Sequence, residues 1–191
     1  MANILSVDQI RGAGGATIDL TNPRVNMAGH IIQIVQGVLS TSASGTTAVG
    51  TNTYDDSGLL ARITPSSASS KILVSYNMCA SSFNGYSGKT RIVRNNTPIG
   101  LGVQQGTRSV STSSAHTYYS VAGTSVHHVT LHANQYLDTP NTTSEITYKI
   151  QVAAYNTVGW GVNRSANYQD GGTQGYDSTP ISTLTLMEIG G

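Results

Sequence analysis

Two stretches in the middle of the chain decide the fold. Residues 59–78 read LLARITPSSASSKILVSYNM, and residues 90–100 read TRIVRNNTPIG. In the first stretch, Pro65 has no backbone N–H and favours an extended conformation in Thr64. The apolar run Leu59–Ile63 is therefore predicted to be a strand that ends at Thr64. Residues 71–78 then alternate between apolar and polar side chains, which is the pattern of a second strand with one buried face.

The second stretch predicts a β-hairpin. The short strands Arg91–Arg94 and Thr97–Ile99 flank Asn95 and Asn96, and asparagine tolerates the positive φ angles of a tight hairpin turn. A later stretch, Glu145–Ala153, alternates most regularly of all and predicts a half-buried strand. These patterns are typical of the walls of a β-sandwich and carry no catalytic motif.

The rest of the chain adds further strands separated by turn residues. The candidates are Ile31–Val38, His116–Val121, Val126–Leu131, Val158–Asn163 and Ile181–Ile189. Valine, isoleucine and tyrosine fit a pleated surface, whereas serine, threonine, asparagine and glycine favour turns. We therefore predict an all-β fold without helices, an antiparallel β-sandwich or jelly roll that spans residues 30–191.

Composition excludes several classes of function. Of 191 residues only 10% are charged, and the formal net charge is +1, so nothing favours binding to nucleic acid, an anionic membrane or an acidic substrate. A single cysteine, Cys79, rules out an intramolecular disulfide and a multi-cysteine metal site. The chain starts without an export signal and has no run near the roughly 18 apolar residues of a membrane span, so we expect a soluble protein made in the cytoplasm.

Residues 1–29 differ in character from the rest. Two extended candidates, Ile4–Ile10 and Thr17–Leu20, flank a glycine-rich turn, and such a segment is too small to bury a core of its own. Two interpretations stay open: a strand that lies on its own domain, or an anchor that binds another subunit or protein. In an anchor, the contacts would come from the apolar side chains Ile4, Leu5, Val7, Ile10, Ile18 and Leu20.

A set of short motifs follows in a fixed order along the chain. The motifs are Ile31–Gln36, Ile63–Ser67 with Ser69–Val74, Arg91–Arg94 with Ile99–Gly100, Tyr136–Pro140 with Tyr148–Gln151, Val162–Ser165 and Leu184–Glu188. The ordered set resembles a domain of tail-fibre-like and other phage virion structural proteins. More distantly, it is similar to the trimeric jelly rolls of the tumour necrosis factor and complement globular-head type. The resemblance implies a homotrimer without catalytic activity, and residues 1–29 resemble the short segments that precede this domain in such fibres.

A histidine cluster is the first candidate for a metal site. His127, His128 and His132 lie close together in the sequence, but on a strand His128 and His132 would be about 13 Å apart on one face, too far for a single ion. We therefore expect packed or surface histidines. A metal on a threefold axis, with one histidine from each of three chains, stays open as an alternative.

The sequence carries no motif for catalysis. No Gly-x-Ser-x-Gly elbow joins a strand to a helix, and the glycines between Gly12 and Gly15 precede no helix and lack a phosphate-binding lysine. Asp55 and Asp56 are interpreted as a solvated turn rather than a cation site. We therefore predict a non-enzymatic protein with no cofactor and no metal site.

Five aromatic residues lie in or beside polar loops, and they are candidates for a recognition surface: Tyr86, Tyr155, Trp160, Tyr168 and Tyr176. Aromatic rings stack on sugars and are enriched at recognition surfaces, although they can equally close the ends of a sandwich or lie in subunit interfaces. The loops that would carry recognition are Ser81–Lys89, Gln104–Ser114 and Asn167–Thr179.

Together with the resemblance, these features predict a virion protein. We expect a short tail fibre or similar appendage that binds other virion proteins through residues 1–29 and contacts a host glycan or protein through its loops. Two alternatives from other classes stay open. One is a capsid decoration protein that stabilises the shell, and the other is a free carbohydrate-binding module.

Overall fold

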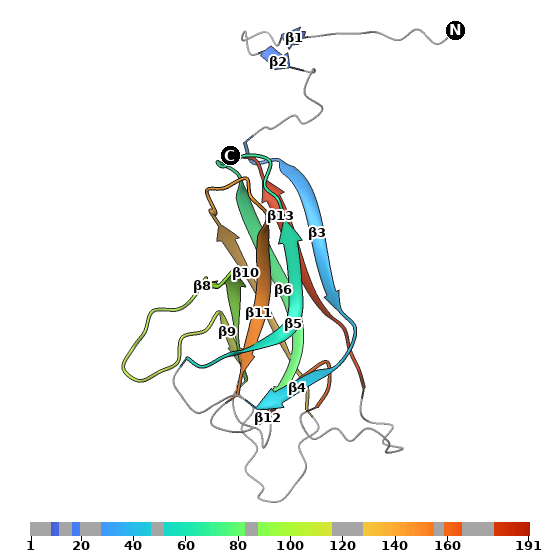
Figure 1. The fold of residues 1–191 in the computed structure, drawn as a ribbon, viewed down its shortest axis with the longest axis vertical. Helices are drawn as coiled ribbons and strands as arrows, with labels where there is room; N and C mark the ends of the chain where they lie inside the picture. Colours follow the sequence, from blue (N-terminus) through green and yellow to red (C-terminus); the bar gives the residue numbers. More distant parts are fainter. Residues whose placement is uncertain are drawn as a thin grey trace, which may run out of the picture.

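The computed structural model describes residues 9–11, 17–19, 28–46, 52–82, 88–115, 128–154, 159–165 and 178–191. Within them the strands are β1 (Gln9–Arg11), β2 (Thr17–Asp19), β3 (Ile31–Leu39), β4 (Ala43–Thr46), β5 (Asp55–Ile63), β6 (Lys71–Ser82), β7 (Gly88–Arg94), β8 (Thr97–Ile99), β9 (Ser113–Ala115), β10 (Thr130–Asp138), β11 (Ile146–Ala153), β12 (Gly159–Val162) and β13 (Ser182–Ile189). No helix occurs in this part of the chain, and two antiparallel sheets pack face to face (Figure 1). The predicted all-β sandwich is confirmed.

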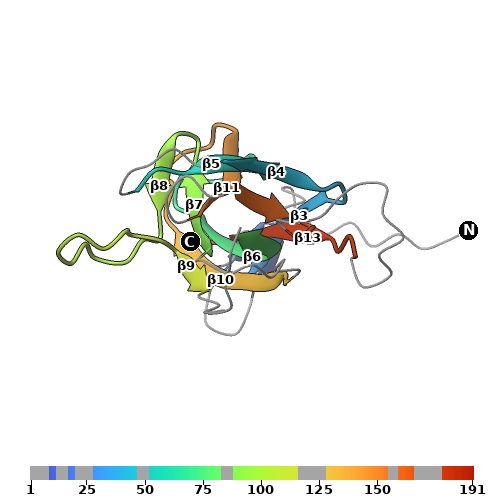
Figure 2. The ribbon, with the colours of Figure 1, turned by 90° about the horizontal axis from the view of Figure 1, so that it is seen from below.

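The strand order is that of a jelly roll. The first sheet runs β3-β13-β6-β12-β4, with β10 also paired to β6, and the second runs β5-β11-β7-β8, with β9 also paired to β7. Strands that are neighbours in the sequence therefore fall largely in opposite sheets, so the sets β3-β13-β6-β10 and β5-β11-β7-β8 form the two walls (Figure 2). The chain enters and leaves the sandwich at one place, because the Gly29 N–H donates to the Gly190 carbonyl at 2.8 Å.

Alternation along the strands builds the core. In β6 and β11 every second side chain points between the sheets and is no more than 1% exposed: Ile72, Val74, Tyr76 and Met78 in β6, and Ile146, Tyr148, Ile150 and Val152 in β11. This is the period of two that the sequence of both strands displays. Burial of these side chains supplies the main driving force for folding.

Side-chain hydrogen bonds fix the predicted turns. Asn95 adopts φ 53° in the β7–β8 hairpin, and its Oδ1 accepts a hydrogen bond of 3.0 Å from the Thr147 N–H of β11. The connection after β5 is held by Glu188, whose carboxylate accepts hydrogen bonds from the Ser66 N–H at 2.7 Å and from Gln33 Nε2 at 2.5 Å. These contacts tie each turn to a strand that is distant in the sequence.

Some strand boundaries differ from the prediction. The solvated turn predicted at Asp55 and Asp56 is wrong, because both residues belong to β5, where Asp56 bonds to Lys149 Nζ at 2.8 Å. β10 begins at Thr130 and runs to Asp138, well beyond the predicted end at Leu131, since it pairs with β6 over its whole length. The predicted strand His116–Val121 lies outside the described residues.

Between residues 1 and 27 the structure describes only the backbone of β1 and β2. These two strands pair with each other, with Ile10 opposite Ile18. Among the described strands, neither pairs with a strand of the sandwich. The other residues proposed for an anchor, Ile4, Leu5, Val7 and Leu20, lie outside the described part of the chain.

Candidate functional site

The outer face of the first sheet is the candidate functional surface. The strand register aligns its side chains in three rows that cross β3, β13, β6 and β10 in turn. The rows are Ile34, Met187, Leu73 and Leu137; Gln36, Thr185, Ser75 and Gln135; and Val38, Thr183, Asn77 and Ala133. We call these residues the sheet face. None of them is charged.

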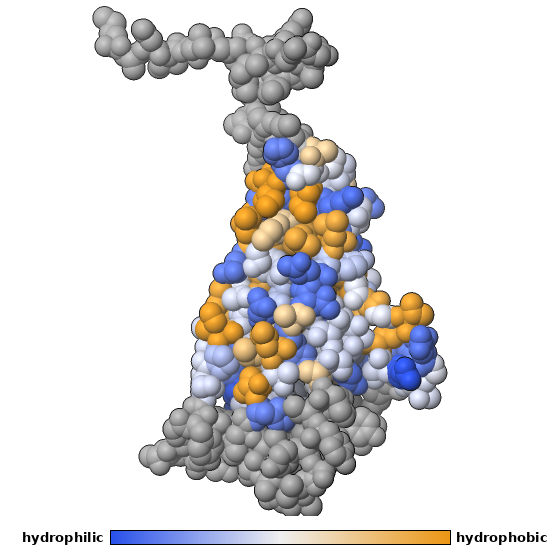
Figure 3. All heavy atoms as spheres, turned by 180° about the vertical axis from the view of Figure 1, so that it is seen from behind, coloured by the Kyte–Doolittle hydropathy of each residue, from blue (hydrophilic) through white to orange (hydrophobic). Residues whose placement is uncertain are grey.

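Apolar side chains are prominent on the sheet face. Ile34, Val38 and Leu137 are 58%, 55% and 46% exposed. Figure 3 views the molecule from this side and shows hydrophobic side chains in an upper and a lower zone, with a more hydrophilic band between them. In the register the polar row lies between the rows of Ile34 and Val38, and within it Gln36 Nε2 donates to Thr185 Oγ1 at 3.0 Å. Exposed apolar patches of this kind mark interaction surfaces.

The outer face of the second sheet has the opposite character. It carries an ion pair between Lys149 Nζ and Asp56 Oδ2 at 2.8 Å. Arg91 donates from Nε to Gln151 Oε1 at 2.8 Å, and its guanidinium lies 4.2 Å from the centre of the Tyr54 ring. Charged groups of this kind belong in contact with water. The sheet face therefore lacks charge, apart from Lys71 at its border, whereas the opposite face is charged, and depletion of charge is the compositional mark of an interface core.

A projecting loop between β8 and β9 is the second exposed feature. We call residues 100–112 the arm (Figure 2). Val103, in the arm, is 89% exposed. The base of the arm is fixed, because the Val110 N–H donates to Asn52 Oδ1 at 2.7 Å and the Val110 carbonyl accepts from the Tyr54 hydroxyl at 2.6 Å. Burial raises the pKa of Tyr54 to about 12, so this hydroxyl stays a donor throughout the physiological range. The arm includes residues 104–112 of the predicted recognition loop Gln104–Ser114.

Two histidines meet at a small pocket at one end of the sandwich. His128 and His132 do not lie on one strand as expected, because β10 starts only at Thr130 and His128 precedes it. Both line a pocket of about 10 Å³, enough for one water molecule, together with Ala80, Ser81, Ser82, Gly88, Ala115 and Thr130. His127 lies outside the described residues.

The environment of the pocket keeps His132 uncharged. Its side chain is 2% exposed, and within the described residues its Nδ1 has no hydrogen-bond partner. Burial lowers the pKa of His132 to about 4 and also lowers the pKa of His128. Across the described chain, no three side chains of histidine, cysteine, aspartate or glutamate are grouped as they would be to hold a metal ion.

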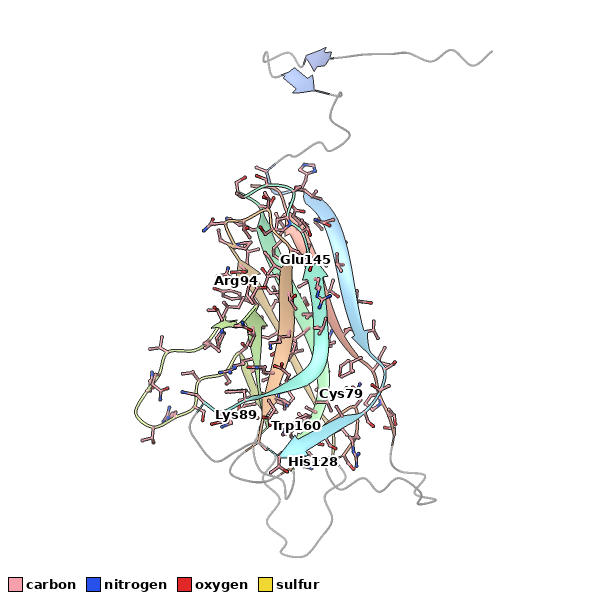
Figure 4. All side chains as sticks on the ribbon, in the orientation of Figure 1. Cys79, Lys89, Arg94, His128, Glu145 and Trp160 are labelled. Carbon is pink, nitrogen blue, oxygen red and sulfur yellow. The ribbon has the colours of Figure 1, made fainter. Side chains whose placement is uncertain are left out.

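The structure corrects one predicted recognition residue. Trp160 is only 6% exposed, and its Nε1 donates to Asp55 Oδ2 at 2.8 Å, so its ring belongs to the packing at the end of the sandwich, where it also covers Gly45 (Figure 4). The prediction that Trp160 forms part of an exposed recognition surface is therefore wrong. The other four aromatic candidates, Tyr86, Tyr155, Tyr168 and Tyr176, lie outside the described residues.

A buried polar cluster links the two walls. Asp138, at the end of β10, is 5% exposed and accepts hydrogen bonds from Arg94 Nη1 at 3.0 Å and from the Tyr148 hydroxyl at 2.6 Å. Burial raises the pKa of Tyr148, and the neighbouring carboxylate raises it further, so the phenol remains protonated. Because all these groups are paired with one another, the cluster acts as a clamp between β10, β7 and β11.

Comparison with known proteins does not assign the chain to a family. No protein-family model matches the chain, and no curated protein sequence matches it. Among the described residues, no helix has the length and apolar character needed to cross a membrane. The jelly-roll fold, the sheet face and the arm are therefore the features from which a function is inferred.

Proposed function

We propose that the protein is a non-enzymatic structural component of a phage virion, a short tail fibre or similar appendage, and that it assembles as a homotrimer. The order of its sequence motifs supports the virion assignment. The observation that carries the proposal is the sheet face, which lacks charge and presents exposed Ile34, Val38 and Leu137. Burial of such a surface against a second copy of the chain removes its apolar side chains from water, which favours association.

Self-association suits this surface better than a charged partner does. An acidic or basic partner would find no complementary group on the sheet face, whereas another copy offers an equally uncharged surface. A trimer requires a head-to-tail contact that closes into a ring, so that each copy uses its sheet face against a different surface of the next copy. β10 lies at the border of the sheet face, and Tyr136, which is exposed on the other side of this strand from Leu137, marks the edge we assign to that second surface.

The remaining parts of the chain complete the proposed division of labour. Residues 1–29 would attach the trimer to the particle. The arm and the loops would contact a glycan or protein on the host surface, because a rigid sandwich can hold exposed polar loops in a fixed position. The arm fits this role through the bracing of its base by Asn52 and Tyr54.

The proposal is tested on virus particles that carry the protein. We expect a chain that lacks residues 1–29 to keep the oligomeric mass of the full chain but to be missing from purified particles. Quantification of the full chain per particle then separates a fibre, present in few copies, from a capsid decoration protein, present in hundreds. Truncated protein found on purified particles would contradict attachment through residues 1–29, and absence of the full chain from particles would contradict the virion assignment.

A further inference from the structure

β10 is attached to the sandwich in a different way from the other long strands. Its inward side carries Thr130, His132, Asn134, Tyr136 and Asp138, opposite Ala80, Met78, Tyr76, Val74 and Ile72 of β6. Where its neighbour offers mainly apolar side chains to the core, β10 offers mainly groups that can form hydrogen bonds. Besides the packing of the Tyr136 ring on Gly100, its attachment to the opposite wall therefore depends on polar contacts.

Two of these polar contacts have partners. Asp138 is clamped by Arg94 and Tyr148, with the Tyr148 hydroxyl 2.6 Å from the carboxylate. Midway along the strand, Asn134 Nδ2 donates to the carbonyl of Thr112 at 2.7 Å. These contacts hold the middle of β10 and its end at Asp138.

His132 differs from these two residues, because its buried Nδ1 has no hydrogen-bond partner among the described residues. The ring packs against the backbone of β7, since a Cβ placed on Gly88 would lie 3.3 Å from its Nε2. The described groups around the pocket are Ala80, Ser81 and Ser82 from β6, Gly88 from β7, Ala115 from β9, and His128 and Thr130 beside it. Among these described groups only His128 titrates, and none is a carboxylate.

The nearest lysine on β7 does not supply a counter-ion either. Lys89 Nζ donates to Ser109 Oγ of the arm at 3.0 Å, and a lysine would repel rather than stabilise a charged imidazole. A proton on His132 would therefore place a charge without a counter-ion among the described groups, on a residue that is only 2% exposed. Such a charge favours any state in which the ring reaches water.

We propose that β10 is an acid-sensitive strand, and that protonation of His132 releases its Thr130 end from β7 and opens its pairing with β6 there. The Thr130 end of β10 also carries Ala133 of the sheet face, so acid loosens the edge of the surface through which the chain assembles. This second consequence rests on the proposed function, whereas the release of β10 does not.

The sign of the effect follows from the pKa of His132. Burial lowers it to about 4 in the folded chain, whereas an exposed histidine titrates near 6.5. The opened state therefore binds the proton more tightly, and opening is favoured progressively as the pH falls from about 6.5 to about 4. The full difference corresponds to an increase of about 300-fold in the opening equilibrium.

Hydrogen exchange of the full chain between pH 7.5 and pH 4.5 tests the proposal. After correction for intrinsic exchange rates, we expect the protected amides among residues 130–133, at the Thr130 end of β10, to lose protection by ten-fold or more as the pH falls, while those of β11 keep theirs. The variant His132→Gln should flatten this profile. The matched control His30→Gln removes an exposed histidine outside β10 and should leave the profile unchanged, as should His128→Gln.

Several results would overturn the proposal. They are protection of residues 130–133 that does not change with pH, an unchanged profile in His132→Gln, or a profile that His128→Gln flattens instead. If His132→Gln fails to fold, histidine NMR of the unaltered chain decides, because a His132 pKa near 6.5 contradicts the proposal and a value below about 5 supports it. A monomer at pH 7.5 would refute the trimer alone, since the exchange of β10 is measured equally well in a monomer.

Discussion

At the scale of single residues, Gly37 shows how closely the two walls approach. It lies in β3, and a Cβ at this position would be 2.0 Å from the carbonyl oxygen of Leu60 in β5. We expect Gly37→Ala to lower the free energy of unfolding by about 1–3 kcal/mol, because the strands must separate to make room. Urea denaturation measures the loss.

Gly102 provides the matched control for this substitution. A Cβ on Gly102, in the arm, would meet no atom within 4 Å. Gly102→Ala should therefore change the unfolding free energy by less than about 0.5 kcal/mol. Equal effects of the two substitutions would show that Gly37 is not limited by the close approach of β5.

Glu188 makes the stability of the fold depend on acid. Burial alone would raise its pKa, but hydrogen bonds from Ser66 and Gln33 outweigh burial and hold the pKa of Glu188 below its usual value. A lowered pKa in the folded state means that the stabilisation is present above the unfolded value of about 4.5 and disappears as the pH falls through the lower folded value.

We expect Glu188→Gln to abolish this part of the acid dependence. Urea denaturation of the variant between pH 5 and pH 3 should give a shallower loss of stability than that of the unaltered chain. The effect of His132 occurs at higher pH, between about 6.5 and 4, so the two residues are distinguishable. Identical pH profiles of the variant and the unaltered chain below pH 5 would refute the role of Glu188.

At the scale of elements, the Asp138 clamp secures one end of β10. Asp138→Asn removes the charge that faces Arg94 while keeping the shape of the side chain. We expect a loss of about 2–3 kcal/mol in unfolding free energy, because charge-assisted hydrogen bonds to a buried carboxylate are lost. Asp56→Asn is the comparison, since the Asp56 side chain is 56% exposed and its ion pair with Lys149 contributes at most about 1 kcal/mol. A smaller loss for Asp138→Asn than for Asp56→Asn would contradict the clamp.

The same scale shows which elements a sequence can predict. β6, β11 and β13 were predictable because their apolar side chains alternate, and the β7–β8 turn was predictable because Asn95 tolerates a positive φ. The length of β10 was not predictable, since its inward side is largely polar and hides the alternation. Asp55 and Asp56 looked like a turn because they are polar and because their partners, Trp160 and Lys149, are more than ninety residues away in the chain.

The candidate site is harder to predict from the sequence than the fold, because it depends on how neighbouring strands are aligned. Alternation in each strand identifies the outward positions, but the apolar row of Ile34, Leu73, Leu137 and Met187 exists only once four strands are aligned. Two of these strands, β3 and β13, lie at opposite ends of the sandwich sequence. Sequence patterns therefore reveal a half-buried strand, whereas the continuity of an uncharged surface emerges from the sheet.

At the scale of the whole molecule, the central claim is that the sheet face is covered by another copy of the chain. Leu137→Lys places a charge in this surface. Leu60→Lys places the same charge on the outer face of the second sheet, at a leucine with similar exposure, 44% against 46%. The two variants should therefore differ in assembly while their folds remain alike.

The most direct test is the mass in solution of the purified full chain, measured by light scattering at pH 7.5 over a range of concentrations. We predict a stable mass of three times the 20.0 kDa of one chain, retained in Leu60→Lys and reduced toward one chain in Leu137→Lys. A monomeric mass at every concentration, or an unchanged trimer in Leu137→Lys, would contradict the claim that the sheet face is the surface of assembly.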